Sequence, residues 1–334
     1  MSFLQAVRGV SEERAPIWLM RQAGRYLPEY LRIKSRSSFE EMTRSPDVAA
    51  EITLQPLRRF PLDAAIIFSD IMTPLEALGI EITFNPGPSI AQPLRTRAQI
   101  EALERREDVA PYVGEALRIV RAALPAGVGL IGFAGAPLTL AAYVIEGGGS
   151  KEYALFRQFL HSDPAALHLL LEKLTDLTIH YLRMQVACGA DAIQLFDSWA
   201  GLHDEQAYRE FGLPYYRRIM DALADAGAAR MFFALGASHL IDVIAEIPAE
   251  VVSVDWRTDL TAARARLPGR ALQGNLDPAA LYADRATLTA EAKRVLHAGL
   301  GGAHIFNLGH GIWPSTPIDA VAHLIETVHD YKRT

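Results

Sequence analysis

The chain has 334 residues, of which 50% are hydrophobic and 22% are charged, with a formal net charge of −6 at pH 7. This acidic balance argues against a nucleic-acid partner, and the single cysteine, Cys188, excludes an internal disulfide and a Cys-rich metal site. The N-terminus shows no basic-then-apolar signal pattern, since Glu12 and Glu13 come early. We therefore expect a cytoplasmic protein.

Short apolar runs alternate with helical patterns along the chain. The apolar runs predict strands near Ile17–Met20, Ala64–Phe68, Val128–Phe133, Ala192–Phe196, Met231–Leu235, Val251–Val254, Ala271–Gln273 and His304–Asn307. The clearest helical pattern covers Pro164–Cys188, with Asp163 as a good N-cap and Gly189 able to end the helix. Ser45-Pro46 and Thr316-Pro317 should open two other helices in the same way.

The stretch between Arg121 and Glu146 carries no charge and could pass for a membrane span. Pro125, Pro137 and four glycines interrupt it. A buried strand followed by a loop and a helix fits this pattern better.

Eight strand–helix units without a break in composition predict a single (β/α)8 barrel over residues 1–334, with an open doubly wound sheet as the alternative. Polar residues after the strands favour the barrel, because strand ends converge on one mouth in a barrel but spread along an edge in an open sheet. These residues are Arg21, Arg25, Ser69, Asp70, Asp197, Ser198, Ser238, His239, Asp255, Asn275 and His310. The Pro- and Gly-rich segment Gly79–Arg97, with strand-like Ile80–Phe84, should border this mouth.

Two arginines, Arg21 and Arg25, follow the first apolar run. Gly24 should let the backbone turn sharply between them, because glycine has no Cβ to clash. A guanidinium is always charged and binds carboxylates through a rigid fork, so the pair suits an anion clamp. Two solvated surface arginines are the alternative.

Asp70 follows the second apolar run directly. It could cap a helix, but Thr73 precedes Pro74 and is the better N-cap, which leaves Asp70 to attract N–H donors or a cation. In the segment Gly132–Ser150, Gly132, Gly135 and Pro137 predict a tight strand-to-helix connection.

Four further side chains complete the candidate site. Tyr143 would offer a hydroxyl two helical turns beyond that connection, with a core tyrosine as the alternative, and Gly147–Gly149 would form a mobile loop. His310, between two glycines, suits a ligand contact. Asp255 and Asn275 would support the site from behind or close the barrel.

Several familiar chemistries lack their residues. The glycines of Gly127–Gly132 precede or lie within a strand, so a nucleotide-binding turn does not fit. Ser198 has no evident His–acid arrangement beside it. The five lysines do not directly follow a strand, which argues against a Schiff base, and no His/Cys cluster suits zinc. The remaining set suits a large polyanion that also offers N–H groups.

These motifs together resemble uroporphyrinogen decarboxylase. The resemblance runs in order through MRQAGRYLPEY, FSDI, GFAGAPLTLAAYVIEGGGS, FDSWAG, VDW, QGNLDP and FNLGHGI, and covers nearly the whole chain. It implies a (β/α)8 barrel, usually a homodimer, that needs neither metal nor organic cofactor. The implied reaction removes CO2 from the four acetate side chains of uroporphyrinogen III, giving coproporphyrinogen III in haem biosynthesis.

The resemblance also implies roles for single residues. Asp70 would gather the pyrrole N–H groups and stabilise the cation formed when the ring is protonated. Substrate carboxylates would be held by Arg21, Arg25 and His310, and carboxylates around the reacting ring by Tyr143 and Ser198. Gln22 and Phe196 would line the site. Arg21 is the first candidate for the proton donor.

The chain departs from the family pattern at Leu138, where tryptophan is common, at Leu235, where lysine is frequent, and in the short loop Asn85–Pro93. These departures concern loop contacts more than the reaction. Two rival functions are a zinc-dependent methyltransferase of the same superfamily, which Cys188 inside a helix does not suit, and a non-catalytic tetrapyrrole-binding protein.

Overall fold

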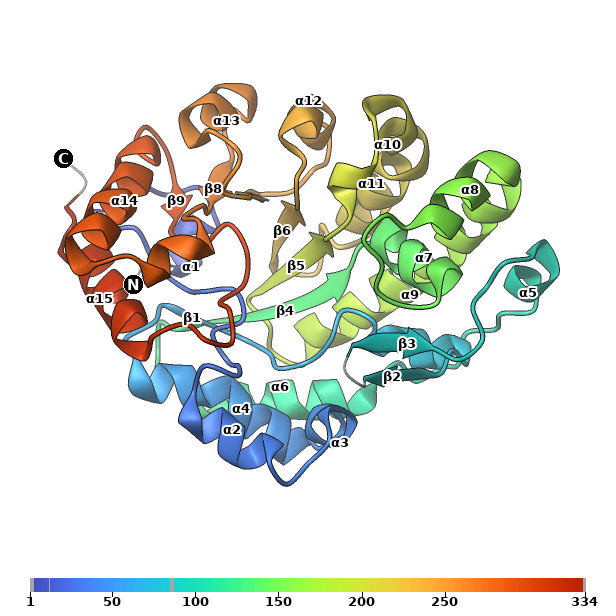
Figure 1. The fold of residues 1–334 in the computed structure, drawn as a ribbon, viewed down its shortest axis with the longest axis horizontal. Helices are drawn as coiled ribbons and strands as arrows, with labels where there is room; N and C mark the ends of the chain where they lie inside the picture. The colour runs from blue at the N-terminus through green and yellow to red at the C-terminus, as the bar shows by residue number, and fades with distance from the viewer. Residues whose placement is uncertain (1–2, 12, 85–86, 333–334) are drawn as a thin grey trace.

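The computed structural model describes residues 3–11, 13–84 and 87–332, and its helices surround a curled parallel sheet (Figure 1). The sheet order is β1-β4-β5-β6-β7-β8-β9, and every neighbouring pair is parallel. The strands are β1 (Ala64–Ile66), β4 (Gly129–Gly135), β5 (Ala192–Asp197), β6 (Ala229–Ala234), β7 (Val251–Val254), β8 (Ala271–Gln273) and β9 (His304–Ile305). The predicted α/β barrel architecture is confirmed, and seven predicted strands are present with small shifts at their ends.

The remaining predicted strand, Ile17–Met20, is not a strand in the structure, so that prediction is wrong. The segment nevertheless closes the sheet. Ile17 forms an isolated parallel bridge with Phe306. The carbonyl oxygen of Pro16 accepts a 2.8 Å hydrogen bond from the Phe306 amide, and that of Ile17 accepts one of 2.9 Å from the Asp63 amide. This segment therefore joins the end beyond β9 to the start of β1.

Side chains stop this segment from pairing further. The Leu19 amide donates to Oε1 of Gln22 at 3.0 Å, and the Met20 amide donates to Oδ1 of Asn307 at 3.0 Å. A strand ladder needs those amides for a neighbouring backbone. The chain consequently leaves the sheet after one bridge and turns toward the barrel mouth.

The helices of the described residues alternate with the strands. The α-helices are α1 (Phe3–Ala6), α2 (Pro28–Lys34), α3 (Phe39–Arg44), α4 (Pro46–Arg59), α5 (Arg97–Glu101), α6 (Pro111–Ala123), α7 (Pro137–Glu146), α8 (Ala154–Ser162), α9 (Pro164–Ala187), α10 (Glu205–Phe211), α11 (Leu213–Ala222), α12 (Ile241–Ile244), α13 (Leu260–Arg266), α14 (Arg285–Ala298) and α15 (Ile318–Asp330). Short 3-10 helices are η1 (Thr73–Leu78), η2 (Ala200–Leu202), η3 (Ser238–Leu240) and η4 (Pro278–Tyr282).

The predicted helix boundaries hold at two of three places. Asp163 caps α9 by accepting from the Ala166 amide at 3.0 Å, and α4 begins at Pro46 after Ser45. The helix predicted to start at Pro317 instead starts at Ile318, because Pro317 has extended dihedral angles and is itself the N-cap. None of the helices in the described part of the chain has the length and apolarity needed to cross a bilayer.

An antiparallel hairpin follows η1 and lies beside α7 (Figure 1). It consists of β2 (Ile82–Phe84) and β3 (Pro88–Ile90), so the predicted excursion contains a second strand; Asn85 and Pro86 lie outside the described residues. The Ile90 amide donates to the Gly147 carbonyl at 3.0 Å, and Ser89 bridges Gly148. The glycine segment after α7 is thus bound to the hairpin.

Candidate active site

The backbone at Arg21 adopts a left-handed conformation, with φ of 62°. The Gln22 amide closes a turn by donating to the Leu19 carbonyl at 2.9 Å. The predicted turn at Gly24 is present, since the Leu27 amide donates to the Gly24 carbonyl at 3.0 Å, but the left-handed backbone lies at Arg21. Such conformations are costly for residues other than glycine and cluster at functional sites. The turn points the chain away from the sheet just where the first arginine of the predicted clamp begins.

Two glycines fit the His310 loop between Arg21 and the loop after β7. A Cβ atom on Gly311 would lie 2.4 Å from Cδ of Arg21, and one on Gly309 would lie 2.3 Å from the Trp256 amide nitrogen. Real Cβ atoms do not approach other atoms so closely, so both contacts need glycine. His310 is consequently held between Arg21 on one side and Trp256 on the other.

Asp70 follows β1 and is half-buried. Its Oδ1 accepts a 2.9 Å hydrogen bond from the Met72 amide, and its Oδ2 accepts none from the residues that the structure describes. Removal from water raises the pKa of the Asp70 carboxyl, while the Met72 amide and the charge of Arg21 oppose that shift. One carboxylate oxygen therefore remains for N–H donors of a ligand.

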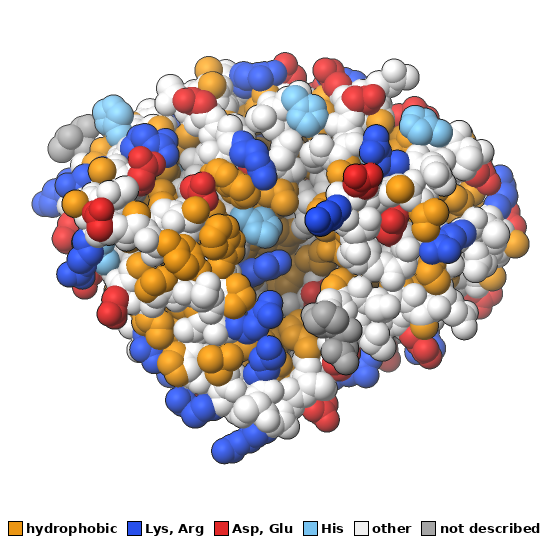
Figure 2. Space-filling model, viewed as in Figure 1, with side chains coloured by type: hydrophobic (Ala, Val, Ile, Leu, Met, Phe, Trp, Pro, Cys, Tyr) orange, Lys and Arg blue, Asp and Glu red, His pale blue; other side chains and the backbone are white. Residues whose placement is uncertain are grey.

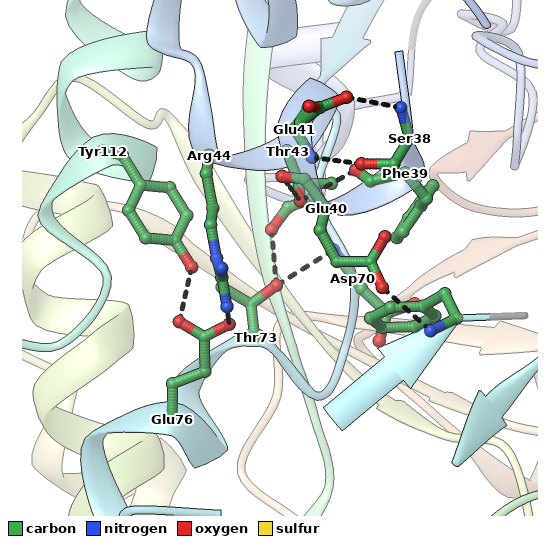
Figure 3. A network of polar contacts seen from close by, with 12 residues as sticks. Ser38, Phe39, Glu40, Glu41, Thr43, Arg44, Asp70, Thr73, Glu76 and Tyr112 are labelled. Carbon is green, nitrogen blue, oxygen red and sulfur yellow. Dashed lines mark hydrogen bonds and ion pairs between the residues drawn. The ribbon is translucent and has the colours of Figure 1, made fainter. Parts of the chain in front are cut away.

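Thr73 holds the Asp70 turn in a different way from the one predicted. It is the first residue of η1, whose N-cap is Met72, so the predicted N-cap role is wrong. Its hydroxyl accepts from the Asp70 amide at 3.3 Å (Figure 3). The same hydroxyl lies 3.1 Å from the Ser69 hydroxyl. Nearby, Glu76 accepts from Tyr112 at 3.2 Å and pairs with an α3 arginine.

Tyr143 lies in α7 and is half-buried. Its ring centroid is 5.9 Å from those of both Tyr153 and Trp199. Burial raises the pKa of the Tyr143 hydroxyl, the charge of Asp70 raises it further, and the charge of Arg21 lowers it. Tyr143 is therefore close enough to Asp70 and Arg21 to interact electrostatically with both.

His310 is half-buried between the two glycines. Burial lowers the pKa of the imidazole to about 4, and the charges of Arg21 and Arg257 lower it further against the opposing charge of Asp255. The imidazole is consequently neutral at pH 7. It can meet a carboxylate as an N–H donor but does not add a positive charge of its own.

An aromatic row crosses the mouth of the barrel. We define it by consecutive ring contacts: Phe133 to Phe196 at 5.6 Å, Phe196 to Phe233 at 5.7 Å, and His310 at 6.5 Å from both Phe233 and Trp256. These rings come from β4, β5, β6 and the loops after β7 and β9. Figure 2 shows a hollow in the middle of this face, with hydrophobic, basic and histidine side chains along it.

Gln22 is not free to present its amide to a ligand. It is 1% exposed, and its Nε2 donates to the Ala64 carbonyl at 3.0 Å while its Oε1 accepts from Leu19. The Gln22 side chain thus connects the turn at Arg21 to strand β1 through two buried hydrogen bonds. Arg25 is exposed, and its charge lowers the pKa of Tyr30, which burial raises more strongly.

Ser198 is half-buried directly after a fully buried carboxylate. That residue, Asp197, accepts from the hydroxyls of Thr139 at 2.7 Å, Tyr208 at 2.9 Å and Tyr216 at 2.7 Å. Three hydroxyl donors compensate the loss of hydration of the charge. Asp197 therefore anchors the end of β5 beneath Ser198.

Asn275 joins two loops at the same end of the barrel. Its Nδ2 donates to the carbonyl oxygens of Asp255 at 2.9 Å and Thr258 at 2.7 Å. This agrees with a supporting role for Asp255 and Asn275. In contrast, Ser238 and His239 are exposed. In the described part of the chain, no group of three or more His, Cys, Asp or Glu side chains could hold a metal ion.

The sequence matches the family model described as Uroporphyrinogen decarboxylase (URO-D) over residues 1–331. It is 42% identical over 335 residues to "Uroporphyrinogen decarboxylase" of Geobacter sp. (strain M21), covering 99% of this chain and 98% of that protein. It is 44% identical over 331 residues to the protein of that name from Syntrophotalea carbinolica, covering 98% and 96%. The chain belongs to the uroporphyrinogen decarboxylase family. This membership confirms the resemblance and identifies the chain as a carboxy-lyase of porphyrin biosynthesis.

Solved structures of proteins with other names share the fold. A methyltransferase from Methanosarcina mazei matches with a TM-score of 0.79 and 20% identity, covering 98% of this chain and 97% of that one. A B12-independent methionine synthase from Shewanella sp. W3-18-1 matches with a TM-score of 0.62 and 11% identity, covering 96% of each. Identities this low show a common fold alone. Cys188 is buried at the end of α9, with Sγ 3.9 Å from Sδ of Met184.

Proposed function

We propose that this chain removes CO2 from the four acetate side chains of uroporphyrinogen III to give coproporphyrinogen III. The observation that carries the proposal is Asp70, a carboxylate with one oxygen left for ligand N–H groups, beside Arg21 and Tyr143. A tetrapyrrole offers pyrrole N–H groups at its centre and carboxylates at its edge. The aromatic row supplies an apolar surface for its rings.

The chemistry needs an electron sink, and a protonated pyrrole can supply it. A proton adds to the ring carbon next to the one that bears the acetate, leaving a cation that is shared between the acetate-bearing carbon and the pyrrole nitrogen. The bond to the carboxylate carbon then breaks, its electron pair forms an exocyclic double bond, and CO2 leaves. A second proton converts the exocyclic carbon to methyl while the ring proton departs, so each cycle consumes one proton in total.

In this proposal Asp70 stabilises the ring cation, which develops on the way to the transition state. Arg21 and Arg25 hold carboxylates by charge, His310 binds one as a neutral donor, and Tyr143 and Ser198 contact those of the reacting ring. Phe196 faces the macrocycle. Arg21 is the first candidate for the proton donor, although its high pKa makes an isolated guanidinium a poor acid.

The test is turnover of the purified protein. Uroporphyrinogen is supplied anaerobically, and the products are oxidised and separated by their number of carboxylates. Conversion from eight to four carboxylates supports the proposal, whereas binding of the eight-carboxylate species without conversion would make the chain a tetrapyrrole-binding protein instead. We also infer from the family a cytoplasmic homodimer, and a monomer mass by light scattering at micromolar concentration would contradict the dimer.

A further inference from the structure

A third arginine, Arg257, lies beside His310 in the loop after β7. Its guanidinium carbon is 4.1 Å from the centroid of the Trp256 ring, and its Nη1 donates to Oδ2 of Asp255 at 2.6 Å. The Trp256 ring is in turn 6.5 Å from that of His310. An aromatic face and a carboxylate therefore fix the position of this charge at the end of the aromatic row.

The Arg257 guanidinium keeps most of its donors available. Its side chain is 52% exposed, whereas that of Asp255 is 1% exposed. A guanidinium has five N–H groups, and among the described residues only Nη1 of Arg257 meets a hydrogen-bond acceptor. Asp255 also accepts from the Gly236 amide at 2.8 Å and the Thr258 hydroxyl at 3.3 Å, so Arg257 is one of several donors to this buried carboxylate.

Arg21 and Arg257 lie next to different sides of the His310 loop. Arg21 contacts Gly311, and Trp256, which precedes Arg257, contacts Gly309. Gly311 makes room for the Arg21 side chain, while Gly309 makes room for the backbone of Trp256. Both charges also lower the pKa of His310. A ligand with carboxylates around the edge of a wide ring requires cations at separate points of the mouth, which this arrangement provides.

We propose that Arg257 is a further carboxylate-binding residue, which holds a peripheral carboxylate of the substrate on the Trp256 side of His310. The proposal rests on the proposed function for the identity of the ligand. It assigns Arg257 to binding and gives it no part in proton transfer. Its guanidinium would contact the substrate equally in the bound and reacting states, so its removal should raise KM and leave kcat nearly unchanged.

The experiment compares Arg257→Gln, Arg257→Met and Arg257→Lys with wild type. Methionine keeps an apolar stem over Trp256, and lysine keeps the charge. The matched control is Arg266→Gln, which removes an arginine from the outer helix α13, where it pairs with Asp242. The readouts are thermal unfolding, fluorescence-monitored binding of oxidised uroporphyrin and coproporphyrin, and kcat and KM with uroporphyrinogen.

Both neutral variants should weaken uroporphyrin binding about fivefold, the scale of a partly exposed charge pair, and raise KM in proportion. Lysine should restore most of the loss, and the control should bind like wild type. Unchanged affinity in both neutral variants would overturn the proposal, as would a fall in kcat that lysine does not rescue. Porphyrin binding that depends on Arg257 in a protein without turnover would refute the decarboxylase proposal and leave this inference standing.

Discussion

Gly311 lies against the side chain of Arg21, so close that a Cβ atom there would be 2.4 Å from Cδ of the arginine. Arg21 itself has a left-handed backbone. The two features together fix the direction in which the guanidinium leaves the chain. Its charge then acts on Asp70, Tyr143 and His310 at once.

Gly311→Ala should therefore displace Arg21. The backbone of Gly311 is outside the left-handed region, so alanine meets the arginine side chain and no strained backbone, and we expect about 1–3 kcal/mol of lost stability. A misplacement of about 1 Å can cost about a hundredfold in rate, so kcat/KM should fall at least tenfold. Urea unfolding and steady-state kinetics measure both effects. Gly87→Ala, which would add a methyl group in open space, should behave like wild type.

Asp70→Asn should keep the fold and lose most turnover. Asparagine can still accept the Met72 amide, but it cannot offset a positive charge on the substrate ring. Loss of such a preorganised partner typically costs about 2.7–4 kcal/mol of barrier, or about two to three orders of magnitude in kcat. Asp284→Asn is the control, since Asp284 caps α14 from an exposed position and asparagine caps equally well. Wild-type rates in Asp70→Asn would remove Asp70 from the mechanism.

His310 should make the folded protein sensitive to acid. Its pKa is about 4 in the fold against an ordinary 6.5, so between these values the unfolded chain binds a proton that the folded chain does not. The stability that comes from burying a neutral His310 is fully present above pH 6.5 and is lost as the pH falls toward 4. Urea unfolding at pH 7, 6 and 5 should therefore show a shallower loss of stability in His310→Gln than in wild type. His203 and His329, whose pKa values burial also lowers, retain part of the slope.

Gln22→Met should act on stability before it acts on catalysis. The substitution leaves the Leu19 amide and the Ala64 carbonyl without their buried partner, which costs about 2–4 kcal/mol. Gln158→Met, at an exposed position of α8, should change stability very little. If Gln22 instead contacted substrate, its variant would unfold like wild type and show a raised KM, which differential scanning calorimetry beside kinetics would reveal.

Much of the barrel could be predicted from the sequence. Buried strands appear as short apolar runs, and helices appear as hydrophobic residues that recur every three to four positions. The N-terminal closing segment has the same apolar run, but side chains of Gln22 and Asn307 take its amides. Gln22 is close in the sequence but its amide gives no periodic signal, and Asn307 is 287 positions away from Met20. Similarly, glycine was the expected turn residue at position 24, whereas the left-handed backbone lies at Arg21, a residue type that gives no sequence signal for it.

The candidate site was predictable where polar residues follow strands directly. Arg257 obeys the same rule two residues after Asp255, so the signal that could have found it was present in the sequence. The aromatic partners of Tyr143, namely Tyr153 and Trp199, carry no such signal because they come from separate loops. The hydroxyls on Asp197 likewise come from α7, α10 and α11, and no local pattern predicts their convergence.

Residues 16–22 both close the ring of strands and carry Arg21. Occupation of the site and closure of the ring are therefore thermodynamically linked through one short segment. A polycarboxylate that binds Arg21 also disfavours opening at the junction, so it should slow hydrogen exchange at the Phe306 and Asp63 amides, which that junction protects. By the same linkage, substitutions that loosen the junction weaken affinity without touching the ligand.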